Sequence, residues 1–283
     1  MKANVKWVQL SSLNLDALTT TMRSSIVKHT QFHQEFGKML PKMTALTELS
    51  MKRLSRCGII SGLLGALPPQ LEVLDLSANS LSISPPFCKA LSRMTNLNEL
   101  DISLCCFNDQ VALLSPSLAK CHALTSLHMN GLLFTSGMAV STLVRGLTQL
   151  QLLHLTDCHM EDHHVAELVR SLYHHSHLTS LSLAGNLLAN ESVQALVDWP
   201  HLLCLEEVGL NMYYNPEPAI SVVEEALQQS LSFRRIVKHP EPEIPLQKAT
   251  RDACQRNAIR HTTLLSLCYD PKRAKGSILV CAK

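Results

Sequence analysis

The sequence lacks the motifs of several classes of enzyme and metal protein. Its ten cysteines never form a CxxC pair, so no common zinc-binding spacing is present. It contains neither GxxxxGK[ST] nor GxGxxG, the glycine-rich loops that bind phosphate groups. Aromatic residues make up only 4% and charged residues 17% of the 283 residues, against 46% apolar residues. This apolar content excludes a disordered chain and is sufficient for a sizeable core.

Long apolar runs are also missing. The nearest candidate for a membrane span, residues 58–71, has 14 uncharged residues and includes Pro68 and Pro69, whereas a membrane helix needs about 20 apolar residues. The first twenty residues lack the continuous apolar stretch of a secretory signal. Thiols without a disulfide pattern are typical of a reducing compartment. We therefore expect a cytoplasmic protein that does not bind membranes.

A repeated leucine pattern organises the chain. Five segments fit the frame L-x-x-L-x-L-x-x-N/C-x-L, except that Leu132 replaces the Asn or Cys in the third; they are LEVLDLSANSL (71–81), LNELDISLCCF (97–107), LTSLHMNGLLF (124–134), LQLLHLTDCHM (150–160) and LTSLSLAGNLL (178–188). Weaker copies start at Val5, Leu46, Leu205, Phe233 and Leu264, and from Leu46 onward the starts lie 25–31 residues apart. A constant period of this length predicts a repeat architecture.

Each copy predicts a strand followed by a turn. In x-L-x-L-x, side chains alternate between the two faces of a strand, so the leucines enter the core and the intervening residues line the other face. The Asn or Cys position then turns the chain away from the strand. A buried Asn at this position both donates to and accepts from turn backbone groups, and we expect Asn79 and Asn186 in that role. Cys105 and Cys158 replace it as small, buried, weak donors.

The remainder of each repeat predicts a helix. Positions 10, 6 and 3 residues before each repeat start are mostly apolar, which is helical spacing. Pro85 and Pro86 suit the first turn of one helix, and Asp109 and Asp162 suit helix N-termini. The stripe residues are Phe87, Leu91, Met94, Leu114, Leu118, Cys121, Val140, Val144, Leu147, Leu168, Leu172, His175, Ala195, Trp199 and Leu202.

The period and frame resemble ribonuclease-inhibitor-type leucine-rich repeats. The resemblance implies an α/β fold, a right-handed solenoid or horseshoe with a parallel β-sheet on the concave face and α-helices on the convex face. We expect an N-terminal cap with a degenerate repeat over 1–45, a repeat core over 46–236, and a C-terminal cap over 237–283. That cap is predicted to contain the proline-rich connector 239–245, a helix over 246–260 and a last strand over 264–268. The chain also resembles some effectors of intracellular bacteria, although no motif carries this likeness; for such an effector the location would be the host cytosol.

Charge is segregated along the chain. Residues 1–56 carry a net charge of +6, residues 57–245 carry −10 and residues 246–283 carry +6. Glu72, Asp75, Glu99 and Asp101 concentrate negative charge on two adjacent predicted strands. These acids either keep an exposed sheet soluble or steer a basic partner protein to it. Nucleic acid is not expected, because such a face repels phosphates.

Apolar residues flank the same face. We expect Phe107 and Phe134, at the last leucine position of the frame, to lie in the core. Exposed apolar anchors carry much of the binding energy at protein interfaces, and candidates exist in the turns and on one strand. The predicted partner-binding residues are Glu72, Asp75, Glu99, Asp101, Leu104, His128, Leu152, His154, Asp157, Glu206, Glu207, Tyr213 and Tyr214.

Metal binding and catalysis are not predicted. His175 falls on the buried helix stripe, so its neighbours His174 and His177 should point elsewhere rather than converge on a metal. Cys158 lies between Asp157 and His159, but its slot is a buried turn position in an acidic region, whereas a reactive thiolate needs an exposed electropositive pocket. We expect no cofactor, no metal and no catalytic residue.

The function expected is stoichiometric binding of another protein. Proteins of the resembled type often cover an enzyme's active site with the concave face, which implies an inhibitor or regulator of a cytosolic protein with a basic or mixed patch. The free chain is expected to be a monomer. The alternatives are an adaptor that forms the recognition arm of a larger assembly, and, as another class, a hydrolase that uses His128, His154 and Asp157.

Overall fold

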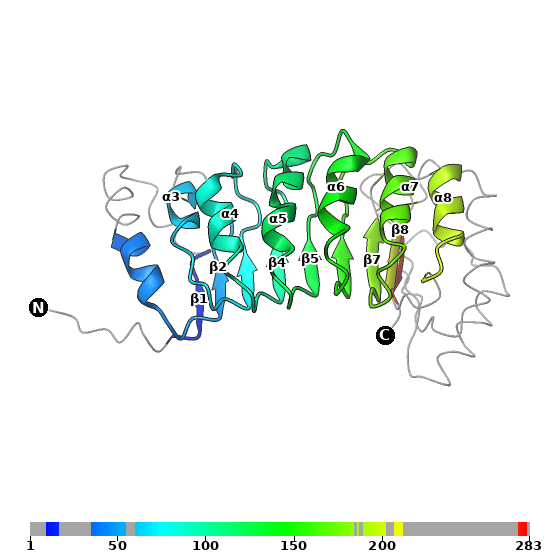
Figure 1. Ribbon diagram of the computed structural model, residues 1–283. Coiled ribbons are helices and arrows are strands. Elements are labelled where there is room, and N and C mark those ends of the chain that lie inside the picture. The colour runs from blue at the N-terminus through cyan, green and yellow to red at the C-terminus, as the bar shows by residue number, and fades with distance from the viewer. Residues whose placement is uncertain are drawn as a thin grey trace, which may run out of the picture. The chain divides into compact units, whose positions relative to one another are not determined.

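The computed structural model describes residues 10–16, 35–54, 60–183, 186, 189–201, 207–211 and 277–281. The chain forms two compact units, Met1–His128 and Met129–Lys283. In the described residues, no helix has the length and apolar character that a bilayer crossing requires. Strands and helices alternate along both units (Figure 1).

The first unit contains a parallel sheet of short strands (Figure 1). They are β1 (Ser12–Asn14), β2 (Glu48–Ser50), β3 (Val73–Asp75), β4 (Glu99–Asp101) and β5 (Ser126–His128). Each strand pairs with the next in the same register, which places the central leucines side by side: Leu13, Leu49, Leu74, Leu100 and Leu127. From β2 to β5 these leucines are at most 1% exposed. The repeat frame therefore predicted both the position and the register of β2 to β5.

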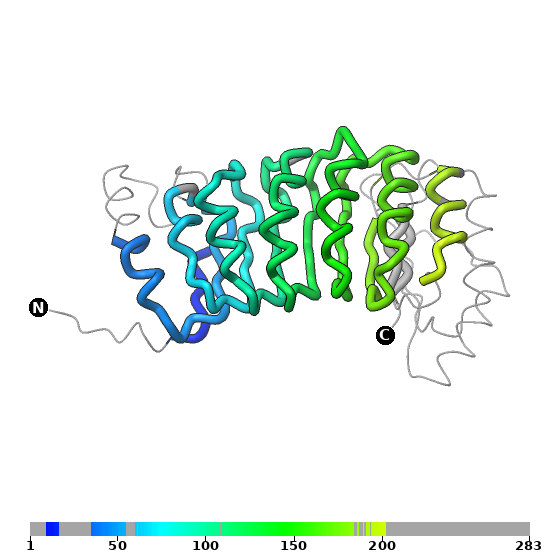
Figure 2. Tube along the Cα trace, viewed as in Figure 1, coloured from blue at the N-terminus to red at the C-terminus, as the bar shows by residue number. Residues whose placement is uncertain are grey.

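Helices of the first unit cover one face of this sheet, as the trace in Figure 2 also shows. They are η2 (Leu40–Lys42), α3 (Ile60–Leu64), α4 (Pro85–Leu91), η4 (Asn108–Leu114) and α5 (Ser115–Leu118). Phe87 and Leu91 on α4, and Met94 just after it, are fully buried, as the stripe predicted. Pro85 and Pro86 open α4, where a missing N–H costs no helical hydrogen bond.

The helical segment after the copy at 97–107 differs from the α-helix that its pattern predicts. Residues 108–114 form a 3-10 helix, and only the four residues of α5 are α-helical. Pro116 provides the physical reason: its ring lacks an N–H and would clash with the carbonyl four residues earlier, so a continuous α-helix through it is disfavoured. The stripe residues Leu114, Leu118 and Cys121 are nevertheless buried.

The second unit continues the same pattern. Strands β6 (Leu152–His154), β7 (Ser180–Leu183) and β8 (Glu207–Asn211) are parallel, with Leu153 opposite Leu181 and Leu181 opposite Val208. The helices are α6 (Gly137–Val144), α7 (Asp162–Ser171) and α8 (Asn190–Val197). The buried stripe is confirmed on α6 and α7, whereas Ala195 on α8 is half-buried and its neighbour Leu196 is buried instead.

Both ends of the repeat array depart from the sequence prediction. The first copy starts at Leu10 and not at Val5, because Leu13 is the residue that pairs with Leu49 and so Leu10, Leu13 and Leu15 occupy the frame. At the other end, β9 (Ser277–Cys281) pairs with β8 in antiparallel orientation. This neighbour of β8 is not the parallel strand that the copy at Phe233 predicts.

The remaining architectural expectations stay predictions. Residues 237–276, which include the proline-rich connector, the helix over 246–260 and the strand over 264–268, lie outside the described residues, as does Leu202. The boundaries 1–45, 46–236 and 237–283, the right-handed twist and the horseshoe shape are likewise predictions. The described residues show an α/β fold in which parallel strands alternate with helices.

Candidate protein-binding face

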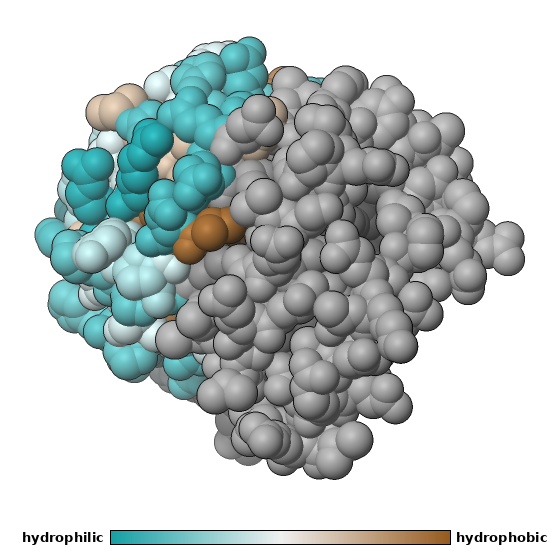
Figure 3. All heavy atoms as spheres, turned by 90° about the vertical axis from the view of Figure 1, so that its right-hand side faces the viewer, coloured by the Kyte–Doolittle hydropathy of each residue, from teal (hydrophilic) through white to brown (hydrophobic). Residues whose placement is uncertain are grey.

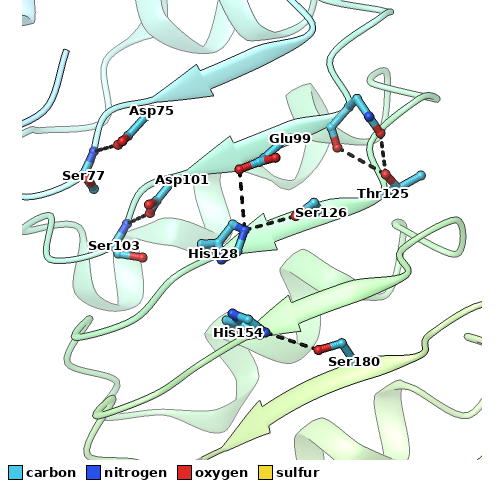
Figure 4. A network of polar contacts seen from close by, with 11 residues as sticks. Asp75, Ser77, Glu99, Asp101, Ser103, Thr125, Ser126, His128, His154 and Ser180 are labelled. Carbon is cyan, nitrogen blue, oxygen red and sulfur yellow. Dashed lines mark hydrogen bonds and ion pairs between the residues drawn. The ribbon is translucent and has the colours of Figure 1, made fainter. Parts of the chain in front are cut away.

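The strand face opposite the buried leucines is polar in the first unit. On β3, β4 and β5 the residues flanking each central leucine are partly exposed. Strand pairing places them in two rows across the sheet (Figure 4). The first row is Glu48, Val73, Glu99 and Ser126, and the second is Asn14, Ser50, Asp75, Asp101 and His128.

Four carboxylates gather on β3 and β4. Glu72 is exposed, whereas Asp75, Glu99 and Asp101 are half-buried, and Asp75 lies directly opposite Asp101 on the neighbouring strand. We call these four residues the acidic face. Like charges directly opposite one another on neighbouring strands destabilise a sheet, so the acidic face carries a cost that a neutral pair would avoid.

Two of these carboxylates also hold the turns that follow their strands. The backbone N–H of Ser77 donates to Asp75 Oδ1 over 2.8 Å, and that of Ser103 donates to Asp101 Oδ1 over 2.8 Å (Figure 4). Alternation alone predicts that Ser77 and Ser103 line the open face, but they are only 2% and 6% exposed. Each serine lies in a turn held by the Asp two residues earlier, where strand alternation no longer sets which side chains are exposed.

Asp16, which follows β1, performs the same task for the turn after β2, and sequence reasoning missed it. Its Oδ1 accepts hydrogen bonds from Ser50 Oγ (2.8 Å) and from the backbone N–H of Lys52 (2.9 Å). With the first copy placed at Val5, Asp16 did not directly follow a predicted strand. The frame starting at Leu10 would have shown that Asp16 follows a strand.

His128 contacts two polar groups of the same face. Its Nε2 lies 3.1 Å from Ser126 Oγ and 3.8 Å from Glu99 Oε1 (Figure 4). Both groups approach the same ring nitrogen, whereas a nucleophile–base–carboxylate arrangement has the carboxylate on the other nitrogen. The contacts therefore favour a role for His128 in a polar binding surface rather than in activating Ser126.

The second unit has its own polar strand face. His154 Nε2 lies 3.3 Å from Ser180 Oγ (Figure 4), and Leu152 and Asp157 are half-buried. Ser180 and Ser182, which alternation places on the open face, are only 8% and 3% exposed. Among the described residues of this unit, the half-buried His154 and Asp157 are therefore more accessible than the two serine hydroxyls.

The Asn and Cys turn positions behave as the repeat pattern predicts. Asn79 Nδ2 donates to the carbonyl oxygens of Met51 (2.8 Å) and Leu76 (2.6 Å), and Cys105 Sγ donates to Leu76 O (3.3 Å). Burial raises the pKa of both Cys105 and Cys158 to about 12. These thiols therefore stay protonated at neutral pH and are poor nucleophiles.

Leu104 is the one predicted anchor that is both described and well exposed. Its side chain is 59% exposed, while Phe107 and Phe134 are at most 2% exposed, as predicted. The backbone of Leu104 has φ 55°, a conformation that residues other than glycine, Asn and Asp rarely adopt. Leu133, in the turn of the next repeat, is 48% exposed.

Several predicted contacts lie at or beyond the limit of the described residues. Glu206, Tyr213 and Tyr214 lie outside them, and for Glu207 the structure describes only the backbone within β8. Their roles stay predictions. The described part of the predicted face is therefore Glu72, Asp75, Glu99, Asp101, Leu104, His128, Leu152, His154 and Asp157.

The histidines do not gather into a metal site in the part of the chain that the structure describes, where no group of three His, Cys, Asp or Glu could hold an ion. His175 is 1% exposed, and its Nε2 lies 3.0 Å from the carbonyl oxygen of Val144. A carbonyl can only accept, so Nε2 carries a proton and donates. His174 and His177 are exposed, so the predicted division between one core histidine and two surface histidines is confirmed.

No family model matches the chain. Among solved structures it is similar to an internalin from Listeria monocytogenes, with 22% sequence identity and a TM-score of 0.43. The match covers 60% of this chain and 49% of the internalin, so the chain spans about half the length of that protein. The strand pairing and the leucine register, rather than this likeness, carry the assignment of a leucine-rich-repeat-like fold.

Proposed function

We propose that this chain is a non-enzymatic binding protein that engages another cytosolic protein through its strand face and thereby inhibits or regulates it. The acidic face provides the electrostatic attraction, and the partner presents a basic or mixed patch. The half-buried imidazole of His154 on β6 is a further candidate contact. A preformed sheet binds with little loss of conformational freedom.

One observation carries this proposal: Asp75 and Asp101 lie opposite each other on neighbouring strands. Each carboxylate needs only one oxygen to hold its turn, and a neutral Asn could accept the same hydrogen bond. The charges are therefore not required by the turns. A cationic partner group between the two carboxylates would turn their repulsion into attraction.

Replacing both residues by Asn separates charge from structure. The Asp75→Asn/Asp101→Asn variant should keep its fold, because Asn retains the acceptor, and should weaken partner binding by more than about 1 kcal/mol per site. The partner is first captured from cytosol on the immobilised full chain and identified by mass spectrometry. The purified partner is then titrated calorimetrically against both proteins.

A matched control removes two charges elsewhere. Glu35→Gln/Glu191→Gln lowers the negative charge by the same amount at exposed helix positions. Each residue forms an exposed ion pair, and such pairs contribute little to stability. The control variant should therefore keep both its fold and its affinity for the partner. Binding to the wild type should also slow between about 0.1 M and about 1 M salt, where the screening length falls from about 10 Å to about 3 Å. Equal affinity of the Asn variant and the wild type would contradict the proposal.

A second candidate function, an adaptor, is favoured by exposed apolar residues on the helical elements. Leu113 on η4 is 61% exposed, Met138 on α6 is 56% exposed, and Tyr173 after α7 is 56% exposed. An adaptor needs a second adhesive surface besides the strand face. An adaptor binds two proteins at once, which distinguishes it from a simple inhibitor. The Met138→Ser/Tyr173→Ser variant should lose one of the two partners and keep the other.

A further inference from the structure

The turn after each strand imposes an unusual backbone conformation at one fixed position. The residue four places after the central leucine has a positive φ in both units: Arg53 (56°), Ala78 (57°), Leu104 (55°), Gly131 (66°) and Asp157 (55°). Glycine adopts this conformation most readily, and Asn or Asp tolerate it better than other residues. The fold therefore favours glycine here, and leucine is among the least suitable residues.

Burial of the Leu104 side chain does not compensate for this unfavourable backbone conformation. Its neighbours Ser103 and Cys105 are 6% and 3% exposed, whereas Leu104 itself is 59% exposed. Isolated exposed leucines are normal on protein surfaces, and Leu113 and Leu133 are examples. Leu104 differs from these two because its backbone is also strained. The turn requires the positive φ but not a leucine, and a bulky residue held in this conformation is a reason to look for function at that residue.

The surroundings of Leu104 define what could bind it. The carboxylate of Asp101 folds over the same turn through its bond to the Ser103 N–H. The Ala78 N–H donates to the Ser103 carbonyl over 2.7 Å, which ties this turn to the neighbouring turn held by Asp75. The turn that carries the exposed Leu104 thus lies beside the turn of the neighbouring repeat, and a carboxylate of the acidic face holds each of the two turns.

We propose that Leu104 is an apolar anchor for a polypeptide segment in which an apolar residue lies close to an arginine or lysine. This inference rests on the proposed function and specifies the chemistry of the partner. Arginine fits especially well, because its aliphatic stem can cover the leucine while the guanidinium binds the Asp101 carboxylate through paired hydrogen bonds. Figure 3 shows the end of the molecule at the right of Figure 1, where the described residues are mostly hydrophilic and the hydrophobic ones form small separate spots.

Leu104→Gly tests the anchor without breaking the turn. Glycine relieves the strained backbone, so the melting temperature should stay the same or rise, while affinity should fall by about tenfold or more if Leu104 is an anchor. Leu104→Met keeps an apolar side chain and should retain most of the affinity. Ala78→Gly makes the same backbone change in the adjacent repeat and should leave binding unchanged.

The probe is a library of random twelve-residue peptides displayed on phage and panned against the immobilised full chain. Enriched peptides are synthesised and titrated by fluorescence anisotropy against the wild type, these three variants and Asp75→Asn/Asp101→Asn. The expected peptides contain Arg or Lys next to an apolar residue, and they bind Leu104→Gly at least tenfold more weakly than the wild type.

The outcomes separate the two proposals. Undiminished binding to Leu104→Gly, a lower melting temperature of that variant, or enriched peptides without an apolar residue would each overturn the anchor. If, in addition, Asp75→Asn/Asp101→Asn binds the peptides weakly, the acidic face stands as a binding surface without the anchor. Peptides that bind all variants equally, or a library that yields no binder, would overturn the anchor as well, while the titration of the captured partner still decides the proposed function.

Discussion

Side chains of different chemistry occupy the turn position of each repeat and satisfy different numbers of backbone groups. Asn186 makes four hydrogen bonds: it donates to the carbonyls of Leu155 (2.7 Å) and Leu183 (2.9 Å) and accepts from the N–H groups of Cys158 (3.1 Å) and Met160 (3.0 Å). The equivalent Cys105 donates one weak bond, to Leu76 O, and its sulfur also has a hydrogen bond with the backbone of Asn79. The cost of losing the side chain should therefore differ between repeats.

Asn186→Ala should lower the free energy of unfolding by about 3 kcal/mol or more, because four backbone groups lose their partner in a buried site. Cys105→Ala should cost about 1 kcal/mol, since it loses only weak hydrogen bonds and little volume. Urea denaturation monitored by circular dichroism measures both. Similar losses for the two variants would show that the hydrogen bonds of the amide do not dominate its contribution.

Residue roles were predictable from the sequence where the repeat frame sets them. Asn79, Asn186, Cys105 and Cys158 lie in the turns as expected, and His175 is buried at its stripe position. The burial of Ser77 and Ser103 was not predictable, because both lie in the turns after their strands, where strand alternation no longer applies. Strand alternation states which face a residue belongs to, but not which neighbour covers it.

Successive helices are joined by a cap that comes from the preceding helix. Asp162, the first residue of α7, accepts hydrogen bonds from the N–H groups of Ala189 (2.8 Å), Glu191 (2.9 Å) and Ser192 (2.8 Å) at the start of α8. Partial burial acts to raise the pKa of Asp162, but the hydrogen bonds from Ser192, Glu191 and Ala189 outweigh it and lower the pKa below its ordinary value. Asp162 thus caps a helix of the next repeat, a role that its position in α7 did not indicate.

Asp162→Ala should destabilise the protein by about 1–2 kcal/mol at neutral pH, and Asp162→Asn by less, because the amide oxygen can still accept. A carboxylate with a lowered pKa stabilises the folded state above its unfolded pKa of about 3.9, and this contribution is lost as the pH falls through the folded pKa. The difference between wild type and Asp162→Ala should shrink between pH 6 and pH 3. Thermal melting at both pH values checks this, and a constant difference would argue against a carboxylate cap.

Elements followed the leucine frame closely in the middle of the chain and poorly elsewhere. Strands β2 to β8 lie where the copies place them. The 3-10 helix at residues 108–114 escaped prediction because the apolar stripe does not register the effect of Pro116 on the helical backbone. The antiparallel pairing of β9 with β8 is not part of the repeat pattern, so the leucine period could not predict it.

The stability of the whole molecule should depend on pH through a buried histidine. Burial lowers the pKa of His175, although the hydrogen bond to the Val144 carbonyl partly opposes this. The unfolded chain then binds a proton more readily than the folded one, so stability is present above the unfolded pKa of about 6.5 and falls as the solution becomes more acidic.

His175→Met introduces a methionine, the residue that occupies the same stripe position in another repeat as Met94. The variant should lose less stability than the wild type between pH 7 and pH 5, as measured by melting temperature. His177→Met, at an exposed position, should retain the wild-type pH dependence. If both variants behave like the wild type, protonation of His175 does not limit acid stability.

Where the turn residue is Asn or Cys, its bond back to the preceding repeat gives the repeat a donor at one boundary and an acceptor at the other. Asn79 reaches the Met51 carbonyl, and Cys158 reaches that of Met129 over 3.1 Å. Duplicating or deleting a whole period keeps these donors and acceptors matched, whereas a cut inside a period orphans one of them. Gene-level gain and loss of complete units is therefore the least disruptive path by which such an array can lengthen or shorten.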